Sequence, residues 1–204
     1  MKDLLHWKPY ALRLRARFLL GVPDISREFA GKTVALVGNA RSLGATRMGE
    51  AIDRCDIVVR FNQCPMVGEP SHGRRTDWIA LSTYLSRQRY LELGARGVLW
   101  FSSRRRKMPA WLAFERRLYV NPREMTRKAL RSIEGRPSTG LMMIHLLSTL
   151  DVHEARLYGF DFFKSRSFSG EHTAETAPHD FSNEERLVHE LMRRDERFVL
   201  CGEQ

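Results

Sequence analysis

The sequence predicts one α/β domain, Rossmann-like, with a mostly parallel central sheet flanked by helices. Short β-branched or aromatic runs alternate with longer helix-like stretches, which is the pattern of layered α/β domains. The short runs are almost continuously apolar, as expected of strands buried on both faces of a parallel sheet. A length of 204 residues with 43% hydrophobic content suits one substantial core.

The alternation assigns each element a place along the chain. The expected strands are, in order, 33–37, 56–61, 78–82, 97–101, 118–121, 155–158 and 197–201. The expected helices are 45–54, 84–93, 122–133, 138–150 and 182–194. Pro122 suits a first helical position, and Ser138 and Ser182 suit amino-terminal caps.

Residues 1–30 are predicted to form a basic amphipathic arm, and 31–204 the single domain. Within 1–20, Leu and aromatic residues alternate with Lys and Arg, without the apolar centre or cleavage site of a signal peptide. A segment packed on the domain and a segment that binds an anionic membrane surface both fit this pattern. The longest strongly apolar stretch, 137–150, is too short to span a bilayer, so no transmembrane helix is expected.

The charge balance limits the partners without choosing one. Lys and Arg number 34 against 24 Asp and Glu, and the net charge of +10 would attract nucleic acid, an anionic membrane or an acidic substrate. The basic run at 104–107 is a solvated loop or an anion or membrane contact. No nucleic-acid partner is expected, because basic residues are dispersed and no RNA-recognition, zinc-finger or helix-turn-helix pattern is present.

The three cysteines favour a reducing compartment, since an odd count argues against a disulfide framework.

Polar residues follow two of the predicted strands directly. Gly38 and Asn39 end the first strand, and Asn62 ends the next. Ligands of open α/β sheets gather at the carboxyl ends of strands, where a following helix favours phosphate, and amides can donate to a phosphate and accept from a ribose hydroxyl. A nucleotide phosphate is therefore expected here. The motif is neither a P-loop nor a dinucleotide fingerprint, and a plain Gly-Asn turn is the alternative.

Two further segments carry candidate chemistry. Ser138, Thr139 and Gly140 open the most apolar helix, where free N–H groups can meet an anion and a glycine permits close approach. A His in a loop before a helix, as at 179, can act as a general base, although a surface His would look the same. We expect neither metal nor cofactor, because no Asp-x-Asp pair and no zinc-ligand spacing is present.

These segments together resemble a known family. Several positions in register resemble the large sialylmotif of the animal-type sialyltransferases, glycosyltransferase family 29. They are Val34 to Leu43, Gly49, Ile52, Asp53, Asp56, Val59 to Asn62, Gly68, Glu69, Gly73, Arg75 and Thr76. Residues 137–140, followed by 157–160, resemble the small sialylmotif, and His179 with Glu184 reproduces the very short His-x4-Glu motif. The order and spacing of the motifs make the resemblance specific.

The resemblance implies a modified GT-A-like fold and a function. The implied reaction is the inverting, metal-independent transfer of sialic acid from CMP-sialic acid to a hydroxyl of a glycan or glycolipid acceptor. By the resemblance, His179 is the base, Glu184 its structural partner, and His172 a group near the leaving phosphate. The implied donor-binding residues are Gly38, Asn39 and Asn62 at the phosphate and ribose, Ser138, Thr139 and Gly140 at the phosphate and sugar carboxylate, and Gly159 and Phe160 beside cytosine.

Departures from the family pattern and open alternatives complete the prediction. Val34 occupies the position of the family's first disulfide cysteine, and 151–154 contains no partner cysteine. This implies a cytoplasmic, bacterial relative, with peripheral contact to the inner face of the cytoplasmic membrane as an option. The alternatives are another CMP-activated keto acid such as Kdo as donor, a non-catalytic CMP- or glycan-binding protein, and a nucleic-acid-binding module.

Overall fold

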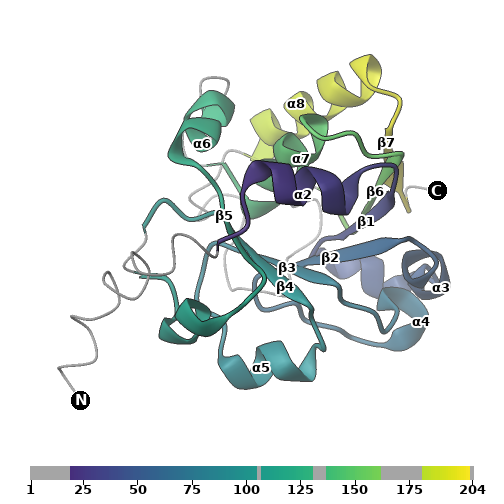
Figure 1. Ribbon diagram of the computed structural model, residues 1–204. Coiled ribbons are helices and arrows are strands. Elements are labelled where there is room, and N and C mark those ends of the chain that lie inside the picture. Colours follow the sequence, from purple (N-terminus) through teal and green to yellow (C-terminus); the bar gives the residue numbers. More distant parts are fainter. Residues whose placement is uncertain (1–18, 105–106, 131–136, 162–180, 203–204) are drawn as a thin grey trace.

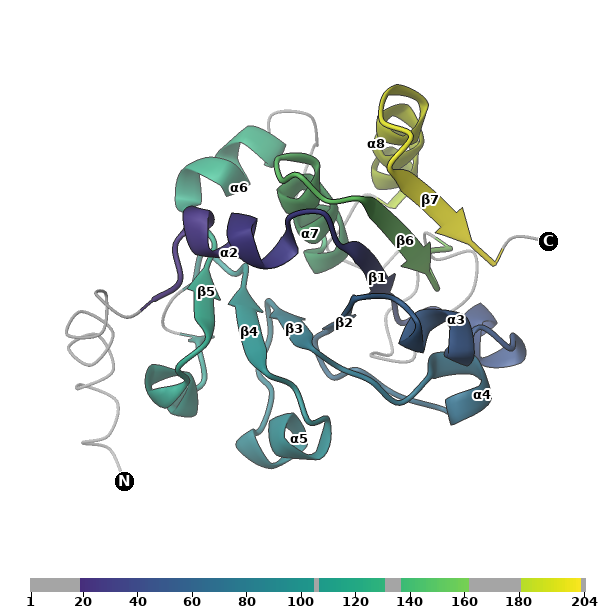
Figure 2. The ribbon, with the colours of Figure 1, turned by 45° about the vertical axis from the view of Figure 1, so that its right-hand side comes forward.

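All strands of the described chain lie in one parallel sheet. The computed structural model describes residues 19–104, 107–130, 137–161 and 181–202 (Figure 1). Within these ranges the 7-stranded sheet has the order β5-β4-β3-β2-β1-β6-β7 (Figure 2). The strands are β1 (Thr33–Val37), β2 (Ile57–Phe61), β3 (Trp78–Leu81), β4 (Gly97–Trp100), β5 (Leu118–Val120), β6 (Glu154–Tyr158) and β7 (Phe198–Cys201). The chain thus builds outward from β1 to β5 and then returns to the other side of β1, and the predicted fold class is confirmed.

The apolar strand sequences follow from cover on both faces of the sheet. Along β1, Val34 and Leu36 enter one hydrophobic cluster, whereas Ala35 and Val37 enter another. Alternate side chains of a strand point to opposite faces, so each face needs its own apolar set. A sheet exposed on one face would have shown alternating polar residues instead.

Helices form a layer on each face (Figures 1 and 2). α2 (Val22–Phe29), α7 (Thr139–Ser148) and α8 (Phe181–Arg194) contribute to the larger cluster, and α6 (Arg123–Leu130) packs against it through Met125. The opposite face is covered by α3 (Gly49–Asp53), α5 (Arg87–Glu92) and the 3₁₀ turn Ala110–Phe114. α4 (Glu69–His72) packs beside α3. No helix in the described ranges is both long and apolar enough to cross a membrane.

Several elements differ from those predicted. The expected helix at 45–54 is a 3₁₀ turn, Arg41–Ala45, followed by the short α3. The Thr46 hydroxyl and backbone N–H both bind the Leu43 carbonyl, at 2.8 and 3.0 Å, and end the turn. Residues 22–29 of the predicted arm form α2, whose Ile25 and Phe29 are fully buried. α4 and the turn at Ala110–Phe114 are additional elements.

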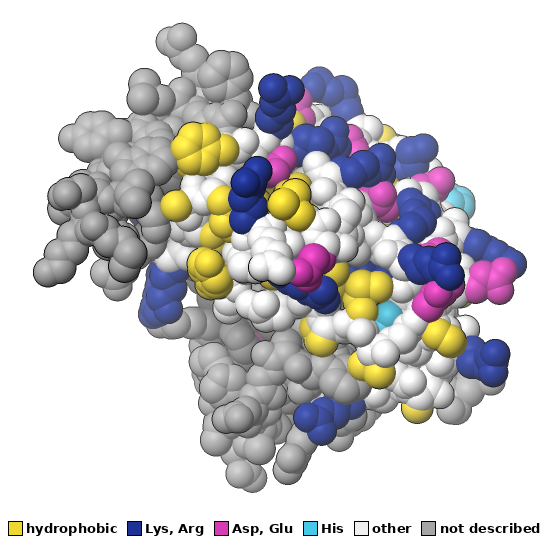
Figure 3. Space-filling view, turned by 90° about the horizontal axis from the view of Figure 1, so that it is seen from below, with side chains coloured by type: hydrophobic (Ala, Val, Ile, Leu, Met, Phe, Trp, Pro, Cys, Tyr) yellow, Lys and Arg dark blue, Asp and Glu magenta, His cyan; other side chains and the backbone are white. Residues whose placement is uncertain are grey.

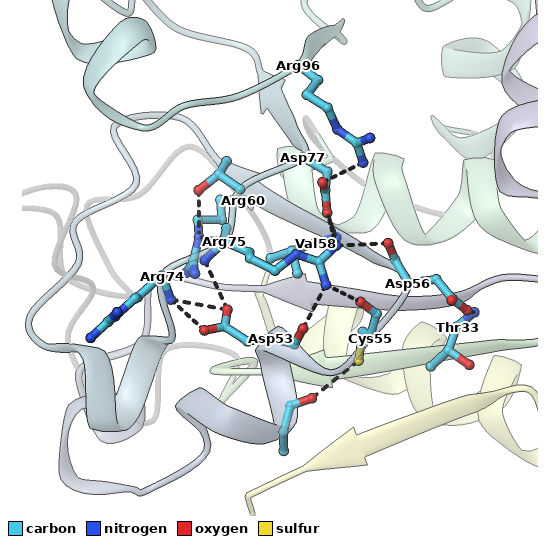
Figure 4. Close-up of polar contacts among 12 residues, drawn as sticks. Thr33, Asp53, Cys55, Asp56, Val58, Arg60, Arg74, Arg75, Asp77 and Arg96 are labelled. Carbon is cyan, nitrogen blue, oxygen red and sulfur yellow. Dashed lines mark hydrogen bonds and ion pairs between the residues drawn. The ribbon is translucent and has the colours of Figure 1, made fainter.

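A polar network ties the chain together where β2 and β3 begin (Figure 4). The Arg75 guanidinium donates to the backbone carbonyls of Asp53, Cys55 and Asp56 and to the Asp77 carboxylate, at 2.6 to 3.0 Å. Asp77 also accepts from the Val58 N–H at 2.8 Å. Asp56 and Asp77 precede β2 and β3, so this network occupies the amino-terminal edge of the sheet, away from the strand ends that precede Asn39 and Asn62.

A buried arginine extends the network into the sheet. Arg60 of β2 is 1% exposed, and its guanidinium donates to the carbonyls of Arg75 and His72 and to the Thr76 hydroxyl. Burial lowers the pKa of Arg60, because removal from water disfavours the charged form. Three oxygen acceptors offset that cost, which indicates a structural role for this cation.

Replacing Arg75 with Met is expected to lower the free energy of unfolding by about 2 kcal/mol. The methionine leaves three backbone carbonyls and a carboxylate without their shared donor. Urea unfolding measures the change. The control is Arg74→Met, which removes an exposed Arg74–Glu69 ion pair and should leave stability unchanged. Equal stability of the two variants would contradict a structural role for Arg75.

Candidate functional site

The turns after β1 and β6 meet without intervening side chains. The Gly38 N–H donates to the Tyr158 carbonyl at 2.7 Å, and the Ala40 N–H to the Gly159 carbonyl at 3.4 Å. A methyl group on Gly38 would lie 3.0 Å from the Gly159 carbonyl carbon and closer still to its oxygen. Gly159 itself has φ +66°, a left-handed conformation that glycine adopts readily. The sheet order reverses between β1 and β6, where open α/β sheets bind their ligands.

Asn62 joins three elements at this edge of the sheet. It follows β2 with φ 52°, which asparagine tolerates better than most residues. Its amide nitrogen donates to the Thr139 hydroxyl at 3.4 Å, and its amide oxygen accepts from the Ser82 N–H at 3.0 Å and the Thr83 hydroxyl at 3.3 Å. Asn39 donates to the Phe61 carbonyl at 3.3 Å, so both predicted asparagines lie at the same edge.

The amino terminus of α7 presents two N–H groups that no acceptor among the described residues occupies. The Ser138 hydroxyl accepts from the Leu141 N–H at 3.1 Å, which confirms Ser138 as the cap. Within the described residues, the backbone N–H groups of Thr139 and Gly140 have no hydrogen-bond acceptor. Free N–H groups in the first turn attract an anion.

Glu184 positions the α7 terminus from a separate helix. This residue of α8 is 3% exposed, and its carboxylate accepts from the Ser138 N–H and from the Ser138 hydroxyl, both at 2.6 Å. Charge-assisted bonds of this kind are strong. Glu184 thus accepts from both Ser138 donors and leaves the backbone N–H groups of Thr139 and Gly140 available to a ligand.

An aromatic contact closes the β6 side of the site. The Phe160 ring stands edge-on to Phe61, with ring centroids 5.7 Å apart. A methyl group on Gly140 would lie 2.9 Å from the Phe160 ring, so the first turn of α7 packs directly on this phenylalanine. All eight predicted donor-binding residues therefore lie at the carboxyl edge of β1, β2 and β6 or at the start of α7: Gly38, Asn39, Asn62, Ser138, Thr139, Gly140, Gly159 and Phe160.

Two residues at this edge were missing from the sequence prediction. Ser82 and Thr83 follow β3 and contact Asn62 through the Ser82 N–H and the Thr83 hydroxyl. The Ser82 hydroxyl oxygen is buried and has no hydrogen-bond partner among the described residues. The available signal was their position, because a polar residue directly after a buried strand had already identified Asn39 and Asn62.

Other predicted features have simpler outcomes. His172 and His179 lie outside the described residues. In the described part of the chain, no group of three or more His, Cys, Asp or Glu side chains could hold a metal ion.

Cys55, Cys64 and Cys201 are free thiols, and burial raises the pKa of Cys64 to about 11. A thiol held protonated in this way is a packing residue rather than a nucleophile.

Comparison with known proteins agrees with this geometry. Residues 23–95 match the sequence profile of glycosyltransferase family 29 (sialyltransferase). Over this stretch the chain is similar to the family 29 sialyltransferases. No curated protein sequence matches it significantly. The profile includes Gly38, Asn39 and Asn62, whereas Ser138 to Gly140 and Glu184 lie beyond it.

Solved sialyltransferases share the fold of this chain. A mammalian sialyltransferase superposes with a TM-score of 0.69 at 16% identity, covering 97% of this chain and 79% of the other. A mammalian sialyltransferase in complex with Gal-beta-1-3GalNAc-ortho-nitrophenol gives 0.61 at 18% identity, covering 100% and 87%. CstII from Campylobacter jejuni, in complex with the substrate analogue CMP-3FNeuAc, gives 0.55 at 15% identity, covering 83% and 78%.

Proposed function

We propose that this protein transfers sialic acid from CMP-sialic acid to a hydroxyl group of a glycan or glycolipid acceptor. The observation that carries the proposal is the meeting of Gly38, Asn39 and Asn62 with the α7 terminus and Phe160 at the reversal of the sheet order. Among the solved structures, CstII is in complex with the substrate analogue CMP-3FNeuAc, and a mammalian sialyltransferase is in complex with Gal-beta-1-3GalNAc-ortho-nitrophenol. These molecules indicate the class of ligand that such a fold accommodates.

Each part of the donor has a matching group in this site. The free N–H groups of Thr139 and Gly140 suit the phosphate or the sugar carboxylate, both of which are anions. Asn39 and Asn62 suit the phosphate and ribose, since amides both donate and accept. Phe160 offers an apolar surface beside cytosine. The buried Ser82 hydroxyl would gain a partner from the donor, which favours binding because an unpaired buried hydroxyl is costly.

The chemical step is an inverting displacement at the anomeric carbon. The acceptor oxygen forms a bond to this carbon while the bond from the carbon to the phosphate oxygen breaks and CMP departs. By the resemblance to the sialylmotifs, His179 would accept the proton of the acceptor hydroxyl and His172 would act on the departing phosphate. Negative charge grows on the phosphate as it leaves, so preorganised donors at the α7 terminus lower the barrier. No metal takes part in this proposed reaction.

Calorimetric titration with CMP tests the donor site directly. AMP and UMP serve as controls, and EDTA is present throughout. Saturable binding of CMP alone is the expected result, since Phe160 and the Gly159 turn would recognise cytosine. Failure of every nucleotide to bind would overturn the proposal.

Replacing His179 with Ala is expected to lower kcat about a hundredfold or more, because general bases contribute rate factors of roughly 10² to 10⁴. CMP affinity should be unchanged, since the base acts on the acceptor. Transfer assays with CMP-sialic acid give the first quantity and calorimetry the second. An unaltered kcat would remove His179 from this role.

The alternatives within the same fold are distinguished by simple experiments. Another CMP-activated keto acid, such as CMP-Kdo, also carries a carboxylate beside the anomeric carbon, and donor competition separates it from CMP-sialic acid. A non-catalytic CMP- or glycan-binding protein would bind CMP without consuming any donor.

A nucleic-acid-binding module remains the alternative from another class. Lys and Arg side chains are spread over the described part of the face in Figure 3, with Asp and Glu side chains among them. A continuous basic stripe is the usual footprint of nucleic-acid binding. Affinity for unrelated oligonucleotides that falls steeply with salt would favour this alternative.

We also propose that the protein is cytoplasmic and contacts the anionic inner face of the membrane. The net charge of +10 and the exposed Arg104 and Lys107 support this proposal, because basic groups near an anionic surface each add attraction. Sedimentation with phosphatidylserine vesicles at low salt is the expected result. Equal sedimentation with neutral vesicles would contradict an electrostatic contact.

A further inference from the structure

Exposed apolar side chains gather on the helix layer that contains α5. Among the described residues, three of the five exposed large hydrophobic side chains lie on or beside α5 and the 3₁₀ turn Ala110–Phe114. They are Tyr84, Leu91 and Phe114, which are 61 to 65% exposed. Figure 3 looks onto this side of the molecule, since α5 lies at the bottom of Figure 1, and it shows apolar side chains with basic ones around them. Single exposed side chains are ordinary, whereas a group of them on one face indicates an interaction site.

α5 and the 3₁₀ turn pack together as one unit. The rings of Tyr90 on α5 and Trp111 on the turn have centroids 4.8 Å apart, and the Tyr90 hydroxyl hydrogen-bonds with the Glu115 carboxylate. The Trp111 indole donates to the Leu85 carbonyl at 2.9 Å, and Leu85 itself is fully buried. The exposed side chains therefore project from a fixed backbone, and little conformational entropy is lost when they make a contact.

The charges around these apolar side chains do not balance. The two acids of the segments 84–92 and 107–116 are already engaged: Glu92 pairs with Arg89 at 3.3 Å, and Glu115 accepts from the Arg117 N–H at 3.1 Å. Four exposed basic residues in or next to these segments form no ion pair with any described residue: Arg87, Arg104, Lys107 and Arg116. This face therefore presents cations beside apolar groups.

We propose that Tyr84, Leu91 and Phe114, with these four basic residues, form a docking surface for an anionic bilayer. This inference rests on the proposed membrane contact and gives it a place in the fold. Aromatic and Leu side chains suit the boundary between headgroups and acyl chains, and neighbouring cations add attraction to anionic lipid. A stable protein partner contacts roughly 20 to 30 residues on each side, whereas interfacial binding draws on limited apolar area together with charge.

The docking surface begins beside the candidate site. Tyr84 comes directly after Thr83, whose hydroxyl donates to Asn62 at 3.3 Å. The Gln63 amide donates to the Tyr84 carbonyl at 2.5 Å, which ties this backbone to the segment that follows β2. Docking would therefore bring the β3 end of the site to the headgroup region.

Sedimentation of the full chain with phosphatidylserine-containing vesicles at low salt tests the docking surface. Replacing both Leu91 and Phe114 with Ser should weaken binding about tenfold or more, because the apolar area that enters the bilayer is lost. Replacing both Arg104 and Lys107 with Gln should also weaken it about tenfold or more, since each cation near the surface contributes a factor of roughly five.

Matched controls come from other parts of the molecule. Arg193 and Arg194 are exposed in the last turn of α8, which belongs to the opposite helix layer. Replacing both with Gln removes the same charge and should leave vesicle binding unchanged. Val199→Ser changes an apolar side chain that is 37% exposed on β7 and should also bind as wild type does. Urea unfolding and CMP affinity check that every variant is folded.

The outcomes separate this inference from the proposed contact. An equal loss in the Arg193 and Arg194 variant would mean that net charge alone drives binding, and it would overturn the docking surface. Unchanged binding in both surface variants would overturn it too and would leave the contact to another face. If the Leu91 and Phe114 variant changed the oligomeric state in light scattering, the surface would be a contact between copies. Wild type that ignores anionic vesicles would overturn the membrane contact itself, whereas CMP titration tests the donor site independently.

Discussion

The Glu184→Ala variant is expected to lose about 3 kcal/mol of unfolding free energy and at least about tenfold in CMP affinity. Its carboxylate holds the Ser138 N–H and hydroxyl with two bonds of 2.6 Å in a buried setting. Alanine removes two charge-assisted bonds and leaves both donors without an acceptor. The Ser138 cap then loosens, and with it the free N–H groups of Thr139 and Gly140. Urea unfolding and calorimetry measure the two losses.

The neighbouring Glu185 provides the control for this experiment. It faces His189 at 3.8 Å on the same helix and is partly exposed, and such surface pairs contribute little. Glu185→Ala should therefore keep both stability and CMP affinity. If Glu184→Ala behaved like Glu185→Ala, the α7 terminus would not depend on α8.

The Gly38→Ala variant is expected to lose about 3 kcal/mol of unfolding free energy, at the upper end of overpacking costs. It should also no longer bind CMP measurably. The added methyl group would overlap the Gly159 carbonyl. Both obstructing atoms belong to the backbone, so no side-chain rotation relieves the overlap. The ends of β1 and β6 must move apart, and Asn39 moves with them.

Gly68→Ala is the matched control for this glycine. The nearest atom to an added methyl group there is a Pro70 side-chain carbon at 3.7 Å, which is an ordinary contact. Calorimetry and thermal unfolding should show wild-type behaviour for Gly68→Ala. Wild-type CMP affinity in Gly38→Ala would mean that the contact between the two turns is not part of the donor site.

The strands could be predicted because their side chains share one environment, which is burial between the two helix layers. Val34 to Val37 and Trp78 to Leu81 are buried on both faces, and a continuous apolar run signals this directly. The short elements were not predictable in the same way. α2 combines an exposed polar side with Ile25 and Phe29 beneath it, and its basic surroundings resembled an arm. The turn at Arg41–Ala45 depends on the hydrogen bond from the Thr46 hydroxyl to the Leu43 carbonyl. No pattern in the sequence signals that bond.

For the site, position along the chain identified the strand-end residues but not their pairing. Asn39, Asn62 and the Ser138–Gly140 segment were recognisable as polar groups after apolar strands or before an apolar helix. The bond from Glu184 to Ser138 links positions 46 residues apart, and Glu184 was predicted as a partner of His179. Ser82 and Thr83 carry no motif, and only the hydrogen bonds that they make with Asn62 in the folded chain reveal their place.

The position of β1 in the middle of the sheet has a consequence for biosynthesis. β1 pairs on one edge with β2, which follows it closely in sequence. Its other edge pairs with β6, so that edge stays unpaired until the chain from Val37 to Glu154 has been synthesised. At elongation rates of roughly 5–20 residues per second, that edge stays unpaired for about 6 to 23 s. An unpaired apolar edge is prone to wrong partners. A ribosome-bound intermediate with β1 to β5 in place would therefore be the species most in need of a chaperone. A nucleotide could not protect it, because the proposed donor site includes residues that follow β6.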